Sequence, residues 1–334
     1  MVEFECRSRA AVARLLMSAG LVLAMAACGG GGDESAAVPD PETPPPSSGE
    51  FVTSQHTEAQ IARFENLRYA VRPNTLGLQY TSSDTRLDEL GSSELSLKMD
   101  VYVPPGASST VRKPLVIWIH GGGFYAGSKS DTADEAMSYA RAGYVSATLN
   151  YRLSTGAQLD PNVRLATIQE ATEDVMNAVR FLKVNAATYG IDTTRMVTIG
   201  ASAGGALSLF NAIDPDTLWS AVSDYSGTSS RVSAAVSTGA TLVGNDGGAA
   251  SVLNFAASDS PVLLLHADPT DSETGFTWSG NVLPTQKLIN DSGNVCTTVA
   301  QPDGSHTVDL SLGGAYWTNY LLPFLWARLK LSGV

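Results

Sequence analysis

The feature that most constrains this chain is a serine, Ser202, framed by small residues between a strand-like run and a helix-like run. Residues 195–199 (RMVTI) are rich in β-forming residues, and the alanine-rich residues 203–211 are typical of a helix. Gly200, Ser202 and Gly204 form the pattern Gly-x-Ser-x-Gly between these runs. Such a turn strains the backbone of the serine and requires small neighbours. The pattern predicts a nucleophile elbow, with the Ser202 hydroxyl projecting clear of a sheet.

A second glycine-rich segment, residues 120–124 (HGGGF), directly follows the apolar run 114–119. A continuous apolar run is typical of a strand that is buried on both faces of a parallel sheet. Successive glycines let the backbone turn close to a ligand and point N–H groups inward. Such groups stabilise the negative charge that develops on a carbonyl oxygen in acyl transfer, so this loop is a candidate oxyanion hole. The alternative is a flexible surface loop.

The order of strand-like and helix-like runs predicts the fold class. Strand-like runs at residues 76–81 and 95–103 predict an edge pair after a short amphipathic run at 58–64. From residue 113 onward, strands alternate with helices, which predicts a mostly parallel sheet with helices on both faces, an α/β fold. The later strands are expected at residues 114–119, 144–149, 195–199, 219–224, 261–266 and 295–300, and the helices at residues 131–143, 165–189, 203–211, 284–290 and 315–329.

The chain has only four histidines, so the general base can be sought by elimination. His56 lies beside a linker, His120 heads the glycine loop, and His266 ends a buried strand. His306 lies in a turn-rich loop between the last expected strand and the last expected helix. A loop at the carboxyl end of the sheet can reach the serine hydroxyl, as a general base must. His306 is therefore the candidate base, and the alternative for it is a solvated loop histidine.

Three segments together resemble a known fold family. They are residues 118–127 (WIHGGGFYAG), 150–153 (NYRL) and 198–205 (TIGASAGG), and they occur in the order expected for the α/β-hydrolase fold. Within that fold the chain resembles the carboxylesterases and the hormone-sensitive-lipase-like esterases. The first segment is similar to the oxyanion stretch of cholinesterase-type enzymes. The resemblance covers about residues 95–329.

The resemblance carries expectations for individual residues. It implies oxyanion N–H donors at Gly122, Gly123 and Ala203, and a catalytic histidine in the loop that holds His306. Ala201 departs from the family pattern, because relatives often carry Glu, Asp or His there. This departure bears on which subfamily the chain resembles, but it does not change the predicted turn at Ser202.

The acid that orients the histidine is expected between Ser202 and His306 in the chain. Asp268 and Asp271 both follow the strand-like run 261–266. Relatives commonly show His-Gly-x-x-Asp here, and neither aspartate stands four residues after the strand's histidine. The tail SETGF after Asp271 resembles the segment after the family's acid, so Asp271 is favoured and Asp268 is the alternative. Asp224 and Glu273 are lesser candidates, and either favoured aspartate could instead be a turn cap.

The N-terminus has the pattern of an export signal. Three arginines precede an apolar run at residues 15–27, which is too short to span a bilayer as an ordinary helix. The run ends directly before Cys28, which a glycine run follows. This resembles a bacterial lipoprotein signal and implies cleavage before Cys28 and lipidation of it, although Met25 stands where leucine is usual. The predicted organisation is a signal peptide at 1–27, a tether at 28–50 and a catalytic domain at 51–334.

The tether is rich in proline, serine and glycine and cannot build a core, so it would hold the folded domain off a membrane surface. Gly29 stands where an aspartate often marks inner-membrane retention in Gram-negative bacteria, so the outer membrane is favoured. Secretion or a periplasmic location is the alternative.

Composition excludes several classes of function. The 334-residue chain has a formal net charge of −12, which argues against nucleic acid and polyanionic partners. Its three cysteines are Cys6, Cys28 and Cys296, and only Cys296 lies in the expected folded domain, so no disulfide is predicted there. No clustered Cys and His spacing indicates a metal site, and no cofactor is expected. The sequence does not specify the oligomeric state.

These features predict a serine ester hydrolase that works through Ser202, His306 and Asp271 and an acyl-enzyme. The segment between residues 225 and 261 is rich in Ser, Ala and Gly and is too short and polar for a large cap domain. We therefore expect short-chain or exposed esters as substrates, either small molecules or acetyl or feruloyl esters on polysaccharide. A serine peptidase of the same fold and a non-catalytic surface-binding lipoprotein are the alternatives.

Overall fold

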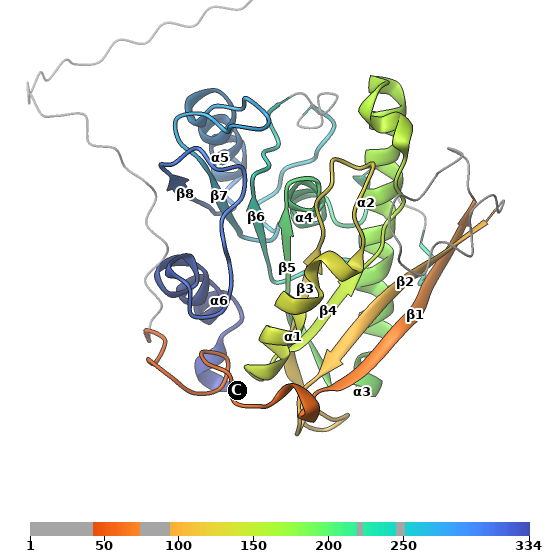
Figure 1. Cartoon of the computed structure of the whole chain (residues 1–334), viewed down its shortest axis with the longest axis vertical. Helices are drawn as coiled ribbons and strands as arrows, with labels where there is room; N and C mark the ends of the chain where they lie inside the picture. The colour runs from red at the N-terminus through yellow and green to blue at the C-terminus, as the bar shows by residue number, and fades with distance from the viewer. Residues whose placement is uncertain (1–42, 74–93, 219–222, 245–250) are drawn as a thin grey trace, which may run out of the picture. The chain divides into compact units, whose positions relative to one another are not determined.

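An eight-stranded sheet organises the part of the chain that the computed structural model describes, residues 43–73, 94–218, 223–244 and 251–334 (Figure 1). These residues all belong to one compact unit, residues 35–334. The order of the strands is β1-β2-β4-β3-β5-β6-β7-β8. The strands are β1 (Ala62–Pro73), β2 (Glu94–Val103), β3 (Lys113–Ile119), β4 (Val145–Leu149), β5 (Ile191–Ala201), β6 (Ala234–Thr238), β7 (Val262–Ala267) and β8 (Cys296–Gln301).

The sheet is mostly parallel, as the alternation of strands and helices predicts. β2 pairs antiparallel with both β1 and β4, and every other neighbouring pair is parallel. In β3 the side chains from Leu115 to Ile119 are all buried, because helices cover both faces of the sheet. The α/β fold class is therefore confirmed.

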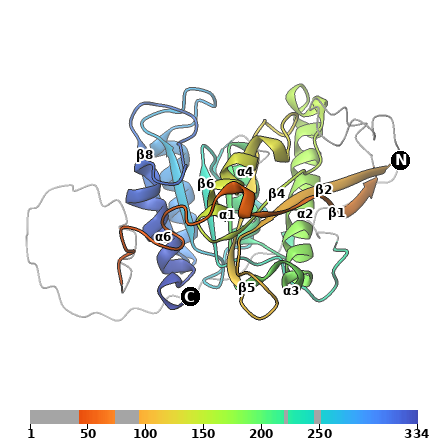
Figure 2. The same cartoon turned by 60° about the horizontal axis from the view of Figure 1, so that its bottom comes forward.

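Successive side chains of β3 enter two different cores, as the twofold period of a strand requires. Ile117 and Ile119 pack on the face covered by α2, α3, α4 and part of α5, whereas Trp118 packs on the face covered by α1 and α6. Figures 1 and 2 show α2 and α6 on opposite sides of the strands. The helices are α1 (Ala133–Arg141), α2 (Pro161–Val184), α3 (Ala186–Tyr189), α4 (Ala203–Ile213), α5 (Leu283–Asp291) and α6 (Leu322–Arg328).

One strand of the sheet, β6, is not among those that the sequence predicts. Residues 219–222 of the strand expected at 219–224 lie outside the described residues, and Ser223 and Asp224 are not in a strand. β5 pairs with β3 on one side and with β6 on the other, and β6 lies in the Ser/Ala/Gly-rich segment for which no strand is expected. The side chains of β6 are all buried, and small ones suffice because helices crowd both faces of a central strand. Apolar patterning alone does not reveal such a strand.

Several element boundaries also differ from expectation. The amphipathic run at 58–64 is a short 3₁₀ turn, Glu58–Gln60, that leads directly into β1. β1 thus pairs with β2, while the run expected to do so, residues 76–81, lies outside the described residues. The long helix expected at 165–189 begins earlier, at Pro161 after the N-cap Asp160, and it is divided between α2 and α3.

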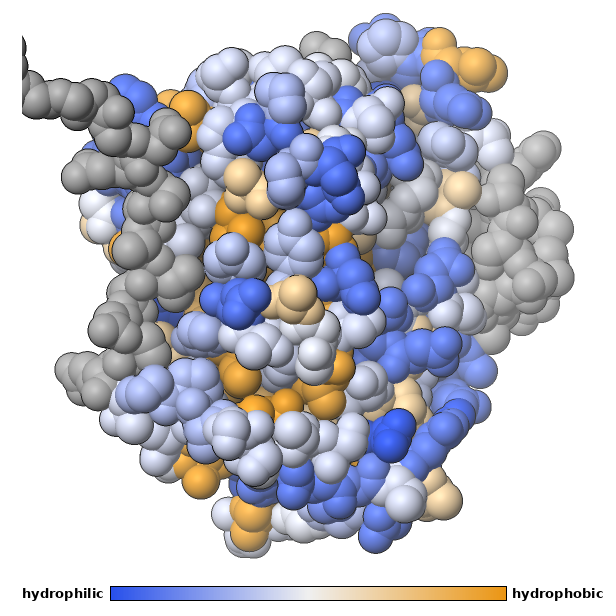
Figure 3. All heavy atoms as spheres, turned by 60° about the vertical axis from the view of Figure 1, so that its left-hand side comes forward, coloured by the Kyte–Doolittle hydropathy of each residue, from blue (hydrophilic) through white to orange (hydrophobic). Residues whose placement is uncertain are grey.

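The predicted signal peptide and most of the predicted tether lie outside the described residues, which begin at residue 43. Within the described ranges, no helix combines the length and the apolar character that crossing a membrane would need. On the face that Figure 3 brings forward, hydrophobic residues form small separate patches among hydrophilic ones, apart from what the grey atoms cover.

A buried ion pair links the end of β4 to α2. Arg152 and Asp174 are almost fully buried, with exposed fractions of 3% and 0%. The Arg152 Nε donates to Asp174 Oδ2 at 2.9 Å, and its Nη2 donates to Oδ1 at 2.9 Å. The Arg152 backbone N–H also donates to the same carboxylate, at 2.8 Å. This pair fixes the segment that follows β4, which carries Tyr151 against the glycine loop.

Replacing Asp174 by Asn should therefore lower the free energy of unfolding by about 3 kcal/mol, because it leaves a buried guanidinium short of its main partner. Urea denaturation followed by circular dichroism measures this as a lower midpoint at an unchanged slope. Asp291→Asn is the matched control, since Asp291 pairs with Lys287 on an exposed helix face. This control variant should lose less than about 1 kcal/mol of its free energy of unfolding. Equal losses for the two variants would contradict the role assigned to the buried pair.

Candidate active site

Ser202 lies at the junction between β5 and α4 and has the backbone of a nucleophile elbow. Its φ of 54° and ψ of −121° lie in a region that residues with side chains rarely adopt. The Ser202 N–H donates to the carbonyl of Thr238 at 2.8 Å, and its carbonyl accepts from the Ala206 N–H at 3.1 Å. The end of β6 and the first turn of α4 thus hold the strained residue in place.

The glycines of the serine pattern are required by close packing. A Cβ on Gly204 would lie 2.1 Å from the carbonyl oxygen of Ile119, and one on Gly200 would lie 2.0 Å from that of Gly204. No real Cβ tolerates such distances to backbone atoms. The small residues around Ser202 therefore allow α4 to start directly against the ends of β3 and β5.

The structure brings three of the predicted site residues together. His306 Nε2 lies 2.9 Å from Ser202 Oγ, and His306 Nδ1 lies 2.6 Å from Asp271 Oδ2. With the ring proton assigned to Nδ1, that N–H donates to the carboxylate and Nε2 is free to accept the serine proton. The arrangement can therefore deprotonate the serine and then stabilise the imidazolium that forms.

Asp271 is held as a charged acceptor. It is 1% exposed, and its Oδ1 accepts the backbone N–H groups of Glu273 and Thr274 at 2.8 and 2.9 Å. Burial alone would raise the pKa of this carboxyl, but the hydrogen bonds from His306 and from the two N–H groups outweigh it and keep the pKa below its usual range. The Asp271 side chain is thus ionised at neutral pH.

The other candidate acids lie elsewhere. Asp268 is anchored through its backbone N–H, which donates to the Gln301 carbonyl, and the structure gives its carboxylate no contact with His306. Asp224 forms an ion pair with Arg72 at 2.9 Å. A Glu273 carboxylate oxygen lies 4.0 Å from His306 Nε2, but this side chain is 71% exposed. Asp271 is therefore the acid that the geometry favours.

The remaining histidines have other surroundings. His120 is buried, its Nδ1 lies 2.8 Å from the Gly121 carbonyl, and its ring stacks on Tyr151. His266 is buried behind the acid, with Nε2 3.7 Å from Asp271 Oδ2. Burial lowers the pKa of His266, so its ring is neutral at neutral pH and adds no second positive charge beside Asp271. His56 contacts the end of α1 through its backbone.

The glycine loop presents free backbone donors. Gly122 and Gly123 have positive φ angles of 103° and 61°. The Gly122 carbonyl accepts the N–H groups of Tyr125 and Ala126, each at 3.0 Å, which closes the loop on itself. Among the residues that the structure describes, the N–H groups of Gly122, Gly123 and Ala203 donate to no protein acceptor. Unsatisfied N–H groups of this kind suit an oxyanion.

A tyrosine that the sequence analysis does not single out supports this loop. The Tyr151 hydroxyl lies 2.9 Å from the His120 carbonyl and 3.1 Å from the Gly121 carbonyl. It belongs to the segment NYRL, which carries the family resemblance. The motif could thus have indicated that Tyr151 is important, but it could not have indicated which carbonyls the Tyr151 hydroxyl contacts.

Ser202 and His306 line a small cavity of about 60 Å³. Its other walls come from the glycine loop, α2, α4, the loop after β6 and the loop after Asp271. The lining residues are Gly123, Phe124, Arg164, Ser202, Ala203, Ala206, Gly239, Ala240, Thr274, Phe276 and His306. Within the described residues, no group of His, Cys, Asp and Glu side chains is arranged to hold a metal ion.

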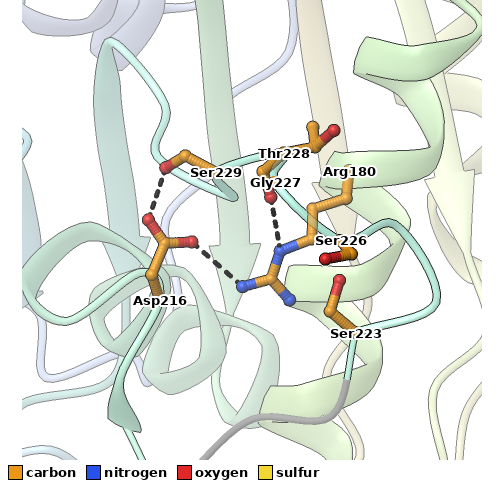
Figure 4. Close-up of a pocket in the computed structure, with 7 residues that line it drawn as sticks. All are labelled: Arg180, Asp216, Ser223, Ser226, Gly227, Thr228 and Ser229. Carbon is orange, nitrogen blue, oxygen red and sulfur yellow. Dashed lines mark hydrogen bonds and ion pairs between the residues drawn. The ribbon is translucent and has the colours of Figure 1, made fainter.

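A larger depression, of about 410 Å³, lies away from these residues beside Arg180 (Figure 4). Arg180 Nη2 is 2.9 Å from Asp216 Oδ1, and its Nε donates to the Thr228 carbonyl at 3.0 Å. The residues that line this depression include no histidine, and the Ser229 hydroxyl there donates to Asp216 Oδ2 at 2.5 Å. Its arginine and aspartate neutralise each other and tie α2 to a neighbouring loop, which is a structural role.

Comparison with known proteins agrees with this geometry. The model of the BD-FAE family matches residues 99–246. The chain is 32% identical to para-nitrobenzyl esterase of Bacillus subtilis over 120 residues, which are 34% of this chain and 23% of that protein. It is 31% identical to mouse (Mus musculus) carboxylesterase 3B over 120 residues, 35% of this chain and 21% of that protein. The chain thus spans less than a quarter of the length of these relatives.

Solved structures of an esterase share the fold. Esterase 2 of Thermogutta terrifontis with bound propionate aligns over 72% of this chain and 88% of its own, with a TM-score of 0.52 and 18% identity. The same esterase phosphonylated by cyclosarin aligns over 71% of this chain and 87% of its own, with a TM-score of 0.55 and 19% identity. The described chain therefore has the fold of α/β-hydrolases.

The two aspartates after β7 should differ sharply when each is replaced. Asp271→Asn should lower kcat for an ester by about 10⁴-fold, because an amide cannot hold the required histidine tautomer or stabilise the imidazolium. Asp268→Asn should change kcat by less than about threefold. Steady-state kinetics on both variants, with circular dichroism to verify folding, measures the difference. The reverse order would overturn the assignment of the acid.

Proposed function

We propose that this chain is a serine carboxylic ester hydrolase. The hydrogen-bonded series Asp271–His306–Ser202, at the start of a helix and beside free N–H donors, is the observation that carries the proposal. The match to the BD-FAE family supports it, because residues 99–246 include the glycine loop and the serine turn. The similarity to carboxylesterases supports it as well. No cofactor is needed for this chemistry.

The proposed reaction begins when His306 takes the Ser202 proton and the serine oxygen attacks the ester carbonyl. The N–H groups of Gly122, Gly123 and Ala203 stabilise the resulting oxyanion. His306 then protonates the departing alcohol, which leaves an acyl group on Ser202. Water, deprotonated by the same histidine, attacks this acyl-enzyme and releases the acid.

The cavity at the serine suggests a small acyl group. Its volume of about 60 Å³ is bounded by the rings of Phe124 and Phe276, which leave no room for a long chain within it. Esterase 2 of Thermogutta terrifontis, whose fold is similar, has been solved with propionate and with butyrate bound. We therefore place short-chain esters, including acetyl groups on an exposed polysaccharide, within the proposed substrate class. A feruloyl group would have to extend beyond this cavity.

The proposal predicts turnover that depends on Ser202 and falls with acyl length. The full chain should hydrolyse p-nitrophenyl acetate and butyrate faster than the decanoate, because the cavity accepts short acyl groups. A fluorophosphonate probe should label the protein, and Ser202→Ala should abolish both the labelling and nearly all turnover. His306→Ala should also abolish nearly all turnover. The lost rate would be about 10⁶-fold for removal of the serine or the histidine.

Two results would point to other functions. Cleavage of peptides without cleavage of esters would favour a serine peptidase of this fold. Neither turnover nor labelling by the probe would favour a binding protein, and the proposal would then be abandoned.

We further propose that the domain is exported and anchored to the cell envelope, with the outer membrane favoured, by lipid on Cys28. The apolar run before Cys28 and the glycine run after it support the proposal. Expression in a bacterium with a clickable fatty acid should label the full chain and direct it to the membrane fraction. Cys28→Ser should remove the label and the membrane association, since the thiol carries the lipid. Labelling that survives this change would place the lipid on another residue, and no labelling of the wild type would favour plain secretion.

A further inference from the structure

The loop that carries the oxyanion donors ends at Phe124, which has a backbone conformation unusual for a residue with a side chain. Its φ is 67°, in the left-handed region, and its side chain is 1% exposed. Such conformations persist only where the surrounding structure holds them, and they concentrate at functional sites. The contacts that hold Phe124 are therefore contacts that hold the oxyanion loop.

Arg164, in the first turns of α2, contacts both sides of the peptide between Gly123 and Phe124. Its Nη1 donates to the Gly123 carbonyl at 3.0 Å, and its guanidinium carbon lies 5.2 Å from the centre of the Phe124 ring. On the far side, the Phe124 carbonyl accepts the Ser154 N–H at 3.0 Å. The arginine thus fixes the carbonyl and the ring, while Ser154 fixes the next carbonyl.

The direction of the Gly123 carbonyl matters for catalysis. The preceding carbonyl, of Gly122, is held by the N–H groups of Tyr125 and Ala126, but the Gly123 carbonyl is held by Arg164. Glycine has no side chain to restrict its own rotation. Without this bond the carbonyl can turn toward the cavity, where its negative end would oppose the developing oxyanion. The Gly123 N–H belongs to the preceding peptide, whose Gly122 carbonyl is held within the loop, so Arg164 acts through the dipole of the Gly123–Phe124 peptide.

We propose that Arg164 is a positioning residue that fixes the Gly123–Phe124 peptide and so keeps the negative end of the Gly123 carbonyl away from the developing oxyanion. This inference rests on the proposed ester hydrolase function. Arg164 also lines the cavity at Ser202, so direct binding of the substrate is the competing role. The two roles separate in the kinetics, because a substrate contact acts on KM and a contact that supports the transition state acts on kcat.

The test uses three variants of the full chain. Arg164→Met removes the hydrogen bond and the charge but keeps the length of the side chain. Arg164→Lys keeps a donor and a positive charge. Arg195→Met is the matched control, since Arg195 pairs with Asp192 at the opposite end of β5 from Ser202. Circular dichroism and thermal melting of each variant report on folding.

For p-nitrophenyl acetate we expect Arg164→Met to lower kcat by about 10- to 100-fold, less than the 10²- to 10³-fold typical of deleting an oxyanion donor. KM should change by less than about threefold. Arg164→Lys should recover part of the lost kcat, and Arg195→Met should resemble the wild type. The pH at which kcat falls on the acid side should not move, because the triad keeps its contacts. A raised KM at unchanged kcat, or an unchanged kcat, would overturn the proposal.

Hydrogen–deuterium exchange gives a readout that does not require turnover. Arg164→Met should speed exchange in a peptide covering residues 120–127, while exchange in α4 after Ser202 stays unchanged. If the wild type lacks esterase activity, faster exchange in that loop alone would still support the positioning role while the proposed function fails. Unchanged exchange in the loop would contradict the positioning role, whatever the activity.

Discussion

The strained backbone of Ser202 is the constraint on which the rest of the site depends. A φ of 54° and a ψ of −121° aim the side chain out of the sheet, and the hydrogen bond to the Thr238 carbonyl holds them. Gly200 and Gly204 then allow the strand, the turn and the helix to approach within distances that no side chain permits. Because β6 supplies the Thr238 carbonyl, the small-residue strand beside β5 is part of the support of the nucleophile.

His306 and Asp271 form a hydrogen-bonded pair whose side chains are largely buried. Asp271 accepts hydrogen bonds from His306 and from two backbone N–H groups, so it stays ionised even though it is buried. His266 stands 3.7 Å from the same carboxylate, but burial keeps it neutral. The negative charge of Asp271 is therefore available to the imidazolium that forms on His306 during acyl transfer.

An oxyanion site must leave backbone N–H groups without a protein acceptor and still hold them in a fixed direction. In the glycine loop, the backbone carbonyls are hydrogen-bonded instead, and these bonds hold the loop. Tyr151 binds the carbonyls of His120 and Gly121, the loop's own N–H groups bind that of Gly122, and Arg164 binds that of Gly123. Tyr151 is held in turn by the segment that the buried Arg152–Asp174 pair anchors. The same contacts thus stabilise this region and hold the geometry of the candidate active site.

The sequence by itself determined the α/β fold class, the nucleophile turn and the glycine loop, because each follows from conformational demands confined to a few consecutive residues. It also narrowed the base to His306 by position, and the acid to the segment after β7. Only the tertiary structure decided between Asp268 and Asp271, because the carboxylate meets a histidine 35 residues away and that histidine meets a serine 104 residues away. The strand β6 and the role of Arg164 were likewise not predictable, since small buried residues and a single arginine carry no periodic pattern. Contacts across the sheet and between loops depend on strand order, which no local window of sequence contains.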